Sequence, residues 1–230
     1  MMKKRLLIIT ALFSVSVAQN IWWVDLKNGN NSNAGSTEAT AFKTVHHALE
    51  SNTWSSGDTI KVKPSLASDG TLSYYDFGND EINLNTSNDF VLMGTGGADN
   101  TIFDAEEKNR HFIFDDGQSS NTIIKGITFQ NGTTTDWPGA GSIYLAGAST
   151  AVQFINCTWK NNSITGNEGG GAIIIRDGAT PSFTGCTFEG NYVNDTDGGN
   201  NGGAVYVQWP NSKVDLENTI YFKKTKFINN

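Results

Sequence analysis

Short apolar runs separated by glycine, asparagine and aspartate recur along most of the chain. Three of these runs align without gaps, at residues 141–145, 171–175 and 203–207. Their first aliphatic residues are Ile143, Ile173 and Val205. The period is about 30 residues, and self-similarity at such a period is typical of proteins built from stacked supersecondary units. The sequence therefore predicts a repeat architecture.

A second motif, an aromatic residue followed closely by asparagine, recurs in phase with the first. Its aromatic positions are Phe129, Trp159, Phe188 and Phe227, and the last interval is clearly longer than the two before it. The long last interval predicts an insertion around residues 211–224. Two motifs that recur together are a strong sign of a genuine repeat.

The repeated unit is predicted to be β-structure, because its runs are short, rich in β-branched and aromatic residues, and bounded by turn formers. Alternation along a strand puts successive side chains on opposite faces. The predicted inner face holds Ile143, Leu145, Ile173, Ile175, Val205 and Val207. The predicted outer face holds Tyr144, Ile174 and Tyr206. One such unit cannot bury its inner face alone, so the units are expected to stack as parallel coils.

The predicted fold is all-β: a right-handed parallel β-helix with a short N-terminal cap helix. Helical spacing of apolar residues predicts the cap helix within residues 41–49. Earlier strands are predicted within residues 22–25, 57–62, 90–93, 101–103, 112–114 and 121–129. The solenoid is predicted over 19–230, with the cap and first strands in 19–65 and the clear repeats in 120–230.

Residues 1–18 are predicted to be a secretory signal peptide. Lys3, Lys4 and Arg5 precede a short apolar run, and small residues stand at positions 16 and 18, before the expected cleavage point. The protein is therefore expected to be exported.

The exported part is acidic. Without Lys3, Lys4 and Arg5, 13 of the 16 basic residues remain against 23 acidic ones, so the formal net charge changes from −7 to −10. An acidic chain with no basic cluster is a poor candidate for binding nucleic acid. The 2 cysteines are too few for a disulfide scaffold or a cysteine-based zinc site.

The repeats resemble a known family. Gly-Gly-Ala-aliphatic followed by Phe-x-x-Asn, at 170–173 with 188–191 and at 202–205 with 227–230, is similar to the repeat of the polymorphic outer membrane proteins best known from chlamydiae. The first copy departs from the pattern, with Gly-Ala-Gly-Ser-Ile at 139–143 and with Asn131 one place early. The opening stretch, residues 23–60, is similar to that of secreted right-handed β-helices of the pectin-lyase-like superfold.

The resemblance implies a non-enzymatic secreted or cell-surface passenger with an adhesin-like role. It implies a location in the cell envelope, at the cell surface or outer membrane of a Gram-negative-type bacterium. The expected partners are host or environmental surfaces, with glycans among them. The family's passengers usually carry a C-terminal membrane translocator, so membrane attachment is expected only through a region beyond Asn230. The exposed last coil also predicts end-to-end self-association.

The alternative function is a carbohydrate-active β-helix enzyme, a polysaccharide lyase or hydrolase. Such enzymes need convergent carboxylates and a basic side chain on one face. The candidates are Asp104, Arg110, Asp115, Asp116, Arg176 and Asp177. None of them recurs at the coil spacing, so no catalytic residue is assigned.

No metal or cofactor site is assigned either. Residues 194–200 superficially resemble a calcium loop through Asp195 and Asp197, but Tyr206 stands where an EF-hand needs its last carboxylate. A turn insertion is the preferred interpretation, with a weak Ca²⁺ site left open. The histidines His46, His47 and His111 are not expected to form a metal site.

Cys157 and Cys186 are separated by one period of the repeat and are expected on adjacent coils. Parallel neighbours direct their Cβ bonds side by side, which favours two buried thiols over a disulfide. Trp137 and Trp209 are expected to anchor loops, with sugar stacking as the other possibility.

Overall fold

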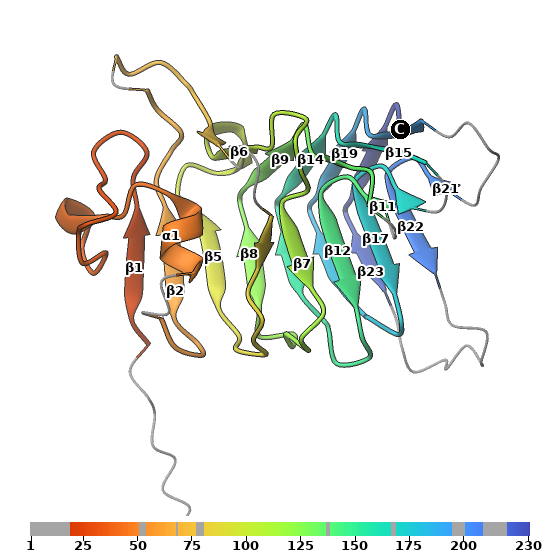
Figure 1. Cartoon of the computed structure of the whole chain (residues 1–230), viewed down its shortest axis with the longest axis horizontal. Helices are drawn as coiled ribbons and strands as arrows, with labels where there is room; N and C mark the ends of the chain where they lie inside the picture. The colour runs from red at the N-terminus through yellow and green to blue at the C-terminus, as the bar shows by residue number, and fades with distance from the viewer. Residues whose placement is uncertain are drawn as a thin grey trace, which may run out of the picture.

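The computed structural model describes residues 19–50, 54–67, 69–76, 81–136, 139–166, 169–194, 201–208 and 220–230. Strands stack coil upon coil into a parallel β-solenoid (Figure 1). The predicted signal peptide, Trp137, Trp209, Asp195 and Asp197 lie outside the described residues. The parallel β-solenoid predicted from the repeats is confirmed, while its right-handed winding stays a prediction.

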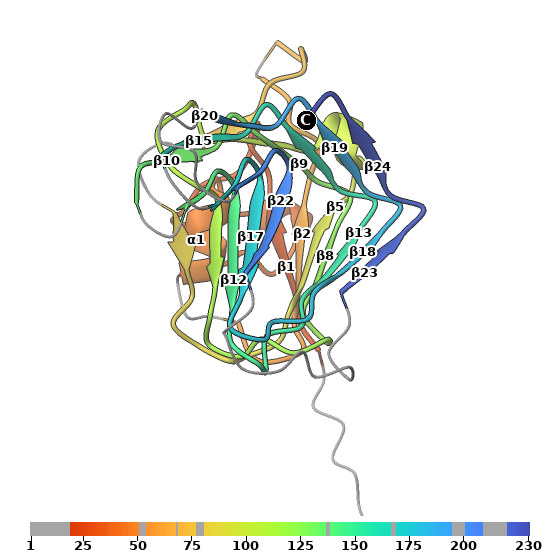
Figure 2. The ribbon, with the colours of Figure 1, turned by 90° about the vertical axis from the view of Figure 1, so that its right-hand side faces the viewer.

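Three sheets form the walls of the solenoid (Figure 2). The long sheet contains β1 (Ile21–Val24), β2 (Thr59–Val62), β5 (Val91–Gly94), β8 (Ile123–Lys125), β13 (Gln153–Ile155), β18 (Ser182–Thr184) and β23 (Tyr221–Lys223). The six-stranded sheet contains β3 (Tyr75–Asp76), β6 (Ile102–Asp104), β9 (Thr128–Gln130), β14 (Thr158–Lys160), β19 (Thr187–Glu189) and β24 (Lys226–Ile228). The five-stranded sheet contains β4 (Ile82–Asn83), β7 (Phe112–Phe114), β12 (Ile143–Ala146), β17 (Ile173–Arg176) and β22 (Val205–Gln208).

Two small sheets lie between the six-stranded and five-stranded walls in the repeat coils. One contains β10 (Thr133–Thr134), β15 (Ser163–Thr165) and β20 (Tyr192–Asn194). The other contains β11 (Gly139–Ala140), β16 (Gly169–Gly170) and β21 (Asn201–Gly202).

The strand register confirms the repeat. Ile143 pairs with Ile173, and Ile173 pairs with Val205, all in parallel. Ile143 and Ile173 are fully buried, as predicted for the inner face. The insertion predicted at residues 211–224 includes too many residues at its C-terminal end, because Tyr221–Lys223 forms strand β23 and pairs with Ser182–Thr184. The extra residues therefore lie between Gln208 and Tyr221.

Single residues with positive φ make the corners between sheets. Gly126, Asn156, Gly185 and Lys224 have φ of 66°, 51°, 66° and 52° and separate the long sheet from the six-stranded sheet. Gly and Asn adopt this left-handed conformation at low cost. The run at 121–129, predicted as one strand, is therefore two strands, β8 and β9, separated at Gly126.

Aromatic side chains stack along the core of the repeat coils. The ring centroids lie 5.6 Å apart for Phe129 and Trp159, 4.7 Å for Trp159 and Phe188, and 4.9 Å for Phe188 and Phe227. Phe129, Trp159 and Phe188 are fully buried. The recurring aromatic position of the sequence is thus the centre of the hydrophobic core.

A helix covers the N-terminal coil. Helix α1 (Val45–Glu50) buries Val45, Ala48 and Leu49 in the core. The helix begins later than predicted, because Phe42 instead forms a parallel bridge to Val24. Short 3-10 helices lie at η1 (Glu38–Thr40) and η2 (Ala98–Asn100). None of the helices among the described residues has the length and apolar character needed to cross a membrane.

Candidate functional site

The outer face of the six-stranded sheet carries a polar groove over the repeat coils. In β9, β14 and β19 the central aromatic residue points inward and is fully buried. The residues on either side of it therefore point outward. The groove has a volume of about 330 Å³, and Ala98 and Asp99 of η2 form part of its lining.

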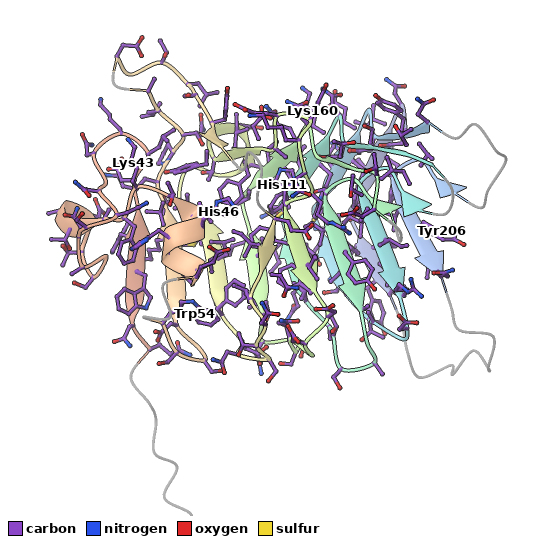
Figure 3. The ribbon with its side chains drawn as sticks, viewed as in Figure 1. Lys43, His46, Trp54, His111, Lys160 and Tyr206 are labelled. Atoms are coloured by element: carbon purple, nitrogen blue, oxygen red, sulfur yellow. The ribbon has the colours of Figure 1, made fainter. Side chains whose placement is uncertain are left out.

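Two columns of side chains cross the groove from coil to coil. Thr128, Thr158 and Thr187 are paired in register, and so are Gln130, Lys160 and Glu189. Neighbouring parallel strands lie about 4.8 Å apart, so each column presents one polar group at every such step. Figure 3 shows Lys160 at the outer surface of this wall.

The two ends of the groove differ in what their side chains already bind. At one end Thr128 Oγ1 donates to the carbonyl of Ala98 at 2.8 Å, and Gln130 Nε2 donates to Asp104 Oδ2 at 2.6 Å. In the next two coils, among the residues that the structure describes, no ion pair forms at Lys160 or Glu189. These later coils therefore have polar side chains available for a ligand.

Asp104, one of the predicted catalytic candidates, is a structural residue. It is 5% exposed and accepts hydrogen bonds from Gln130, from Asn131 Nδ2 and from the backbone N–H of Glu106. It lies on the six-stranded wall, whereas Asp115 and Asp116 follow β7 of the five-stranded wall. The fold does not bring Asp104 together with them.

Two of the other candidates share a column, although they do not lie on adjacent coils. Leu145 pairs with Phe114 and Ala146 pairs with Arg176, so Asp115 and Arg176 fall in one column with Ala146 between them. Tyr144 is the next outward residue on β12, and besides burial the pKa of its hydroxyl is lowered by Arg176 and raised by Asp177 and Asp115. Arg176 Nε forms an ion pair with Asp177 Oδ2 at 2.9 Å. The separation between Asp115 and Arg176 spans two coils, which a search at the single-coil interval does not detect.

Electrostatics around Tyr144 reflect partial burial. Burial raises the pKa of the Tyr144 hydroxyl. Burial, reinforced by the neighbouring Asp116, raises the pKa of the Asp115 carboxyl. The open depression beside Asp115 and Asp116 is lined by turn residues that include Gly147 and Ser149.

Arg110 lies in an ion-pair network with Glu81 and Asp136. Its Nε pairs with Glu81 Oε2, and its Nη2 lies 3.5 Å from Asp136 Oδ2. The Arg110 side chain is 7% exposed. Burial raises the pKa of Glu81 even though Arg110 opposes that shift. Arg110 therefore links Glu81, which directly precedes β4, to Asp136, which follows β10.

His111 is a buried hydrogen-bonding residue. Its Nε2 lies 3.1 Å from the carbonyl oxygen of Phe103, and its Nδ1 lies 3.0 Å from Ser142 Oγ. Burial lowers the pKa of His111 to about 4. Figure 3 shows His111 inside the solenoid, apart from the surface position of Lys160. Within the described ranges, no group of three or more His, Cys, Asp or Glu side chains could hold a metal ion.

Cys157 and Cys186 are free thiols in the core, on adjacent coils as predicted. Cys157 Sγ donates to the carbonyl of Ile124 and Cys186 Sγ to that of Phe154, each at 3.5 Å. Burial raises the pKa of both thiols, that of Cys186 to about 11. Such thiols are unreactive at neutral pH.

The predicted outer column of Tyr144, Ile174 and Tyr206 is in register. Tyr144 and Tyr206 are half-buried, whereas Ile174 is fully buried. The column is therefore interrupted as a contact surface at its middle residue.

Sequence reasoning missed the groove on the six-stranded sheet. Its signal was the residue before each repeated aromatic, which is threonine at 128, 158 and 187. Comparison with protein-family models, curated proteins and solved structures found no match.

Proposed function

We propose that the chain is a non-enzymatic secreted or cell-surface β-solenoid with an adhesin-like role, and that it holds glycan chains in the groove of the six-stranded sheet. The observation that carries the proposal is the pairing of Thr158 with Thr187 and of Lys160 with Glu189 on the open face of adjacent coils. Among the described residues, neither Lys160 nor Glu189 forms an ion pair.

The chemistry of these side chains specifies the ligand. Lys160 only donates hydrogen bonds, Glu189 only accepts them when ionised, and the threonine hydroxyls do both. A ligand that satisfies all of them must offer donors and acceptors at steps of about 4.8 Å. Sugar hydroxyls have this property. The groove is open to solvent and lined mostly by polar side chains, unlike the enclosed apolar pockets of small-molecule sites, and therefore suits a polymer lying across the coils.

The sequence supports a place on the cell surface. The leader at 1–18 favours export, and the Gly-Gly-Ala and Phe-x-x-Asn repeats favour a polymorphic outer-membrane-protein-like passenger of a Gram-negative-type bacterium. Repetition of one coil gives reach and a long periodic surface, which is what attachment to host or environmental glycans needs.

A binding screen tests the proposal. The exported chain is applied to a panel of immobilised neutral glycans, and we expect retention on at least one polymer. Lys160→Gln combined with Glu189→Gln should abolish that retention while leaving the net charge unchanged. The matched control, Lys27→Gln with Glu50→Gln, also removes one charge of each sign at exposed positions and should bind normally. Equal binding by both variants would contradict the groove.

The alternative, a carbohydrate-active enzyme, is favoured by one observation, the arrangement of Asp115 and Arg176 beside Tyr144. Assays on pectins, alginate and glycosaminoglycans, with and without Ca²⁺, distinguish the two functions. We expect no turnover. Turnover that copurifies with the protein and disappears in Asp115→Asn or Asp116→Asn would overturn the non-enzymatic proposal.

A further inference from the structure

The outer face of the long sheet has a composition unlike that of the rest of the protein. In each strand of this sheet the second residue points toward the core, as Leu92, Ile124 and Phe154 do. The outward residues form two columns across the coils. One runs Trp23, Lys61, Met93, Lys125, Ile155, Thr184, Lys223, and the other runs Ile21, Thr59, Val91, Ile123, Gln153, Ser182, Tyr221.

Charge is segregated onto this face. Its outward strand positions include Lys61, Lys125 and Lys223 and no acidic residue, although the chain has a formal net charge of −7. Among the described residues none of the three lysines forms an ion pair. Lys61 Nζ lies over the ring of Trp23, 4.9 Å from its centroid, which orders a cation without neutralising it.

The nearest acidic residues at the opposite ends of these strands are already engaged. Asp58 accepts hydrogen bonds from Trp22 Nε1 and from the backbone of Asn20. Asp89 accepts from Ser119 and Thr122. Both carboxylates precede their strands, whereas the lysines stand at the third strand position, roughly 10 Å further along. The lysines of this column thus have no ion-pair partner within the part of the chain that the structure describes.

The spacing of the lysines indicates an extended ligand. Lys61 and Lys125 are two coils apart, about 10 Å, with Met93 between them. Lys125 and Lys223 are three coils apart, about 14 Å, with Ile155 and Thr184 between them. A complementary molecule has negative groups at intervals of this size and weakly polar surfaces in between. In Figure 2 the wall formed by β8, β13, β18 and β23 has no other labelled element over it.

An anionic polysaccharide fits this description better than a lipid bilayer does. Interfacial binding to a membrane requires apolar side chains that penetrate the headgroup region. Met93, Ile155, Val91 and Ile123 are half-buried between their neighbours on the sheet and offer a contact surface without projecting. The more exposed Ile21 and Tyr221 stand apart on the two end strands, β1 and β23. Sugar rings can lie on such a surface while their carboxylate or sulfate groups pair with lysines.

We propose that the outer face of the long sheet, centred on Trp23, Lys61, Met93 and Lys125, is a docking surface for an anionic polysaccharide lying along the solenoid. This surface is distinct from the groove of the six-stranded sheet, and the proposal stands whether or not that groove binds neutral glycans.

Binding of the exported chain to immobilised alginate, with dextran as the neutral comparison, tests the proposal. We expect binding to alginate and not to dextran, weakened by added salt because the contacts are ionic. The triple variant Lys61→Gln, Lys125→Gln, Lys223→Gln should lose about tenfold in affinity, equivalent to about 1.4 kcal/mol. Unchanged thermal unfolding of the variant confirms that it is folded.

The matched control removes three lysines elsewhere, through Lys27→Gln, Lys43→Gln and Lys108→Gln. Because the net charge change is the same, loss of binding in this control as large as in the face variant would assign binding to general charge and overturn the proposal. Retained alginate binding in the face variant would also overturn it. So would equal competition by phosphatidylglycerol vesicles. The Lys160→Gln, Glu189→Gln variant should still bind alginate. Loss of neutral-glycan binding and loss of alginate binding therefore test the groove and the long-sheet face independently.

Discussion

At the corner that follows the six-stranded sheet, the repeat coils and the coil before them satisfy the same backbone group with different side chains. In the repeat coils the carbonyls of Phe129, Trp159 and Phe188 each accept a hydrogen bond at 3.0 Å from an asparagine of the following coil, respectively Asn162, Asn191 and Asn230. In the earlier coil the carbonyl of Phe103 is reached by His111 Nε2 instead. Because a carbonyl only accepts, Nε2 carries the proton of the neutral imidazole.

The asparagines form a continuous ladder. Asn162 Nδ2 donates to Asn191 Oδ1 at 2.9 Å, and Asn191 Nδ2 donates to Asn230 Oδ1 at 2.8 Å. The ladder ends at Gly132, whose N–H donates to Asn162 Oδ1 at 2.8 Å. A Cβ at Gly132 would lie 2.1 Å from the carbonyl oxygen of Gly141 and 3.0 Å from the His111 ring. Any side chain at position 132 would therefore clash with the backbone of Gly141, and His111 satisfies the Phe103 carbonyl in place of a ladder asparagine.

This difference explains the irregular first repeat. Asn131 is the residue with positive φ at the corner, equivalent to Asn161, and is not a member of the ladder. The position that holds the ladder asparagine in later coils is Gly132. The same backbone carbonyl is thus bound by histidine in one coil and by asparagine in the later coils. Only the asparagine recurs and can be recognised as a sequence motif.

Removing the central asparagine should have the largest effect. Asn191→Leu leaves the carbonyl of Trp159 and the backbone N–H of Asn162 buried without partners. Each unsatisfied buried group costs about 1–3 kcal/mol, so we expect a loss of about 4 kcal/mol in the free energy of unfolding, measured with urea. The control is Asn161→Gly, a change at the exposed corner residue with φ of 54° that should cost almost nothing. Equal losses would contradict the ladder.

Gly132 and Gly190 test whether the corners are interchangeable. Gly132→Ala should cost about 3 kcal/mol, because the new methyl group meets the backbone of Gly141. Gly190→Asn should cost less than about 1 kcal/mol, since its φ of 63° suits asparagine and its Cβ meets only the end of the Asn161 side chain. Thermal unfolding of both variants is the measurement. A tolerated Gly132→Ala would mean that the backbone of Gly141 does not lie against this corner.

The histidine makes the earlier coil sensitive to pH, whereas the ladder contains no titratable group. The pKa of His111 is about 4 in the folded protein against 6.5 for an unperturbed histidine, so the unfolded chain binds a proton first as pH falls. Stability from this residue is present above pH 6.5 and is lost towards pH 4, by about 2 kcal/mol between pH 7 and pH 5. His111→Gln should remove that part of the pH dependence in urea unfolding. An unchanged difference between the two pH values would contradict the assignment.

The smallest effect is expected at the preceding corner. Thr225 Oγ1 donates to the carbonyl of Phe183 at 3.3 Å, the contact that Cys186 makes with Phe154 one coil earlier. Cys186→Thr should therefore change the free energy of unfolding by less than about 1 kcal/mol, because it keeps both the volume and the donor.

Thiol counting on the denatured, unreduced parent should find two free thiols. An intramolecular disulfide in the parent would refute the arrangement.

The sequence predicts the walls of this protein better than its corners. Regular alternation fixed the inward side of Ile143 and Ile173, because burial requires a period of two along each strand. The break at Gly126 was not predictable by that reasoning, since the apolar residues around it read as one continuous strand.

The surface chemistry was the least predictable part. The column of Asp115, Ala146 and Arg176 depends on coil lengths in two intervals, and its middle member has no charge to mark it. The lysine face of the long sheet likewise arises from residues such as Lys61 and Lys125 that stand two coils apart with no shared motif. Columns of this kind can be identified only once the pairing register of every strand is known.

The direction of the asparagine ladder has a consequence for how such a protein changes over generations. Each repeat coil carries the side chain that completes the coil before it, as Asn191 does for Trp159. A gene segment that encodes one coil is therefore self-sufficient when it is copied in tandem, because the copy brings its own donor and leaves its predecessor satisfied. Unequal recombination can lengthen or shorten this part of the gene without compensating substitutions. His111 and Gly132, which lie on adjacent coils, lack that freedom, so length variation among relatives should be confined to the coils after them.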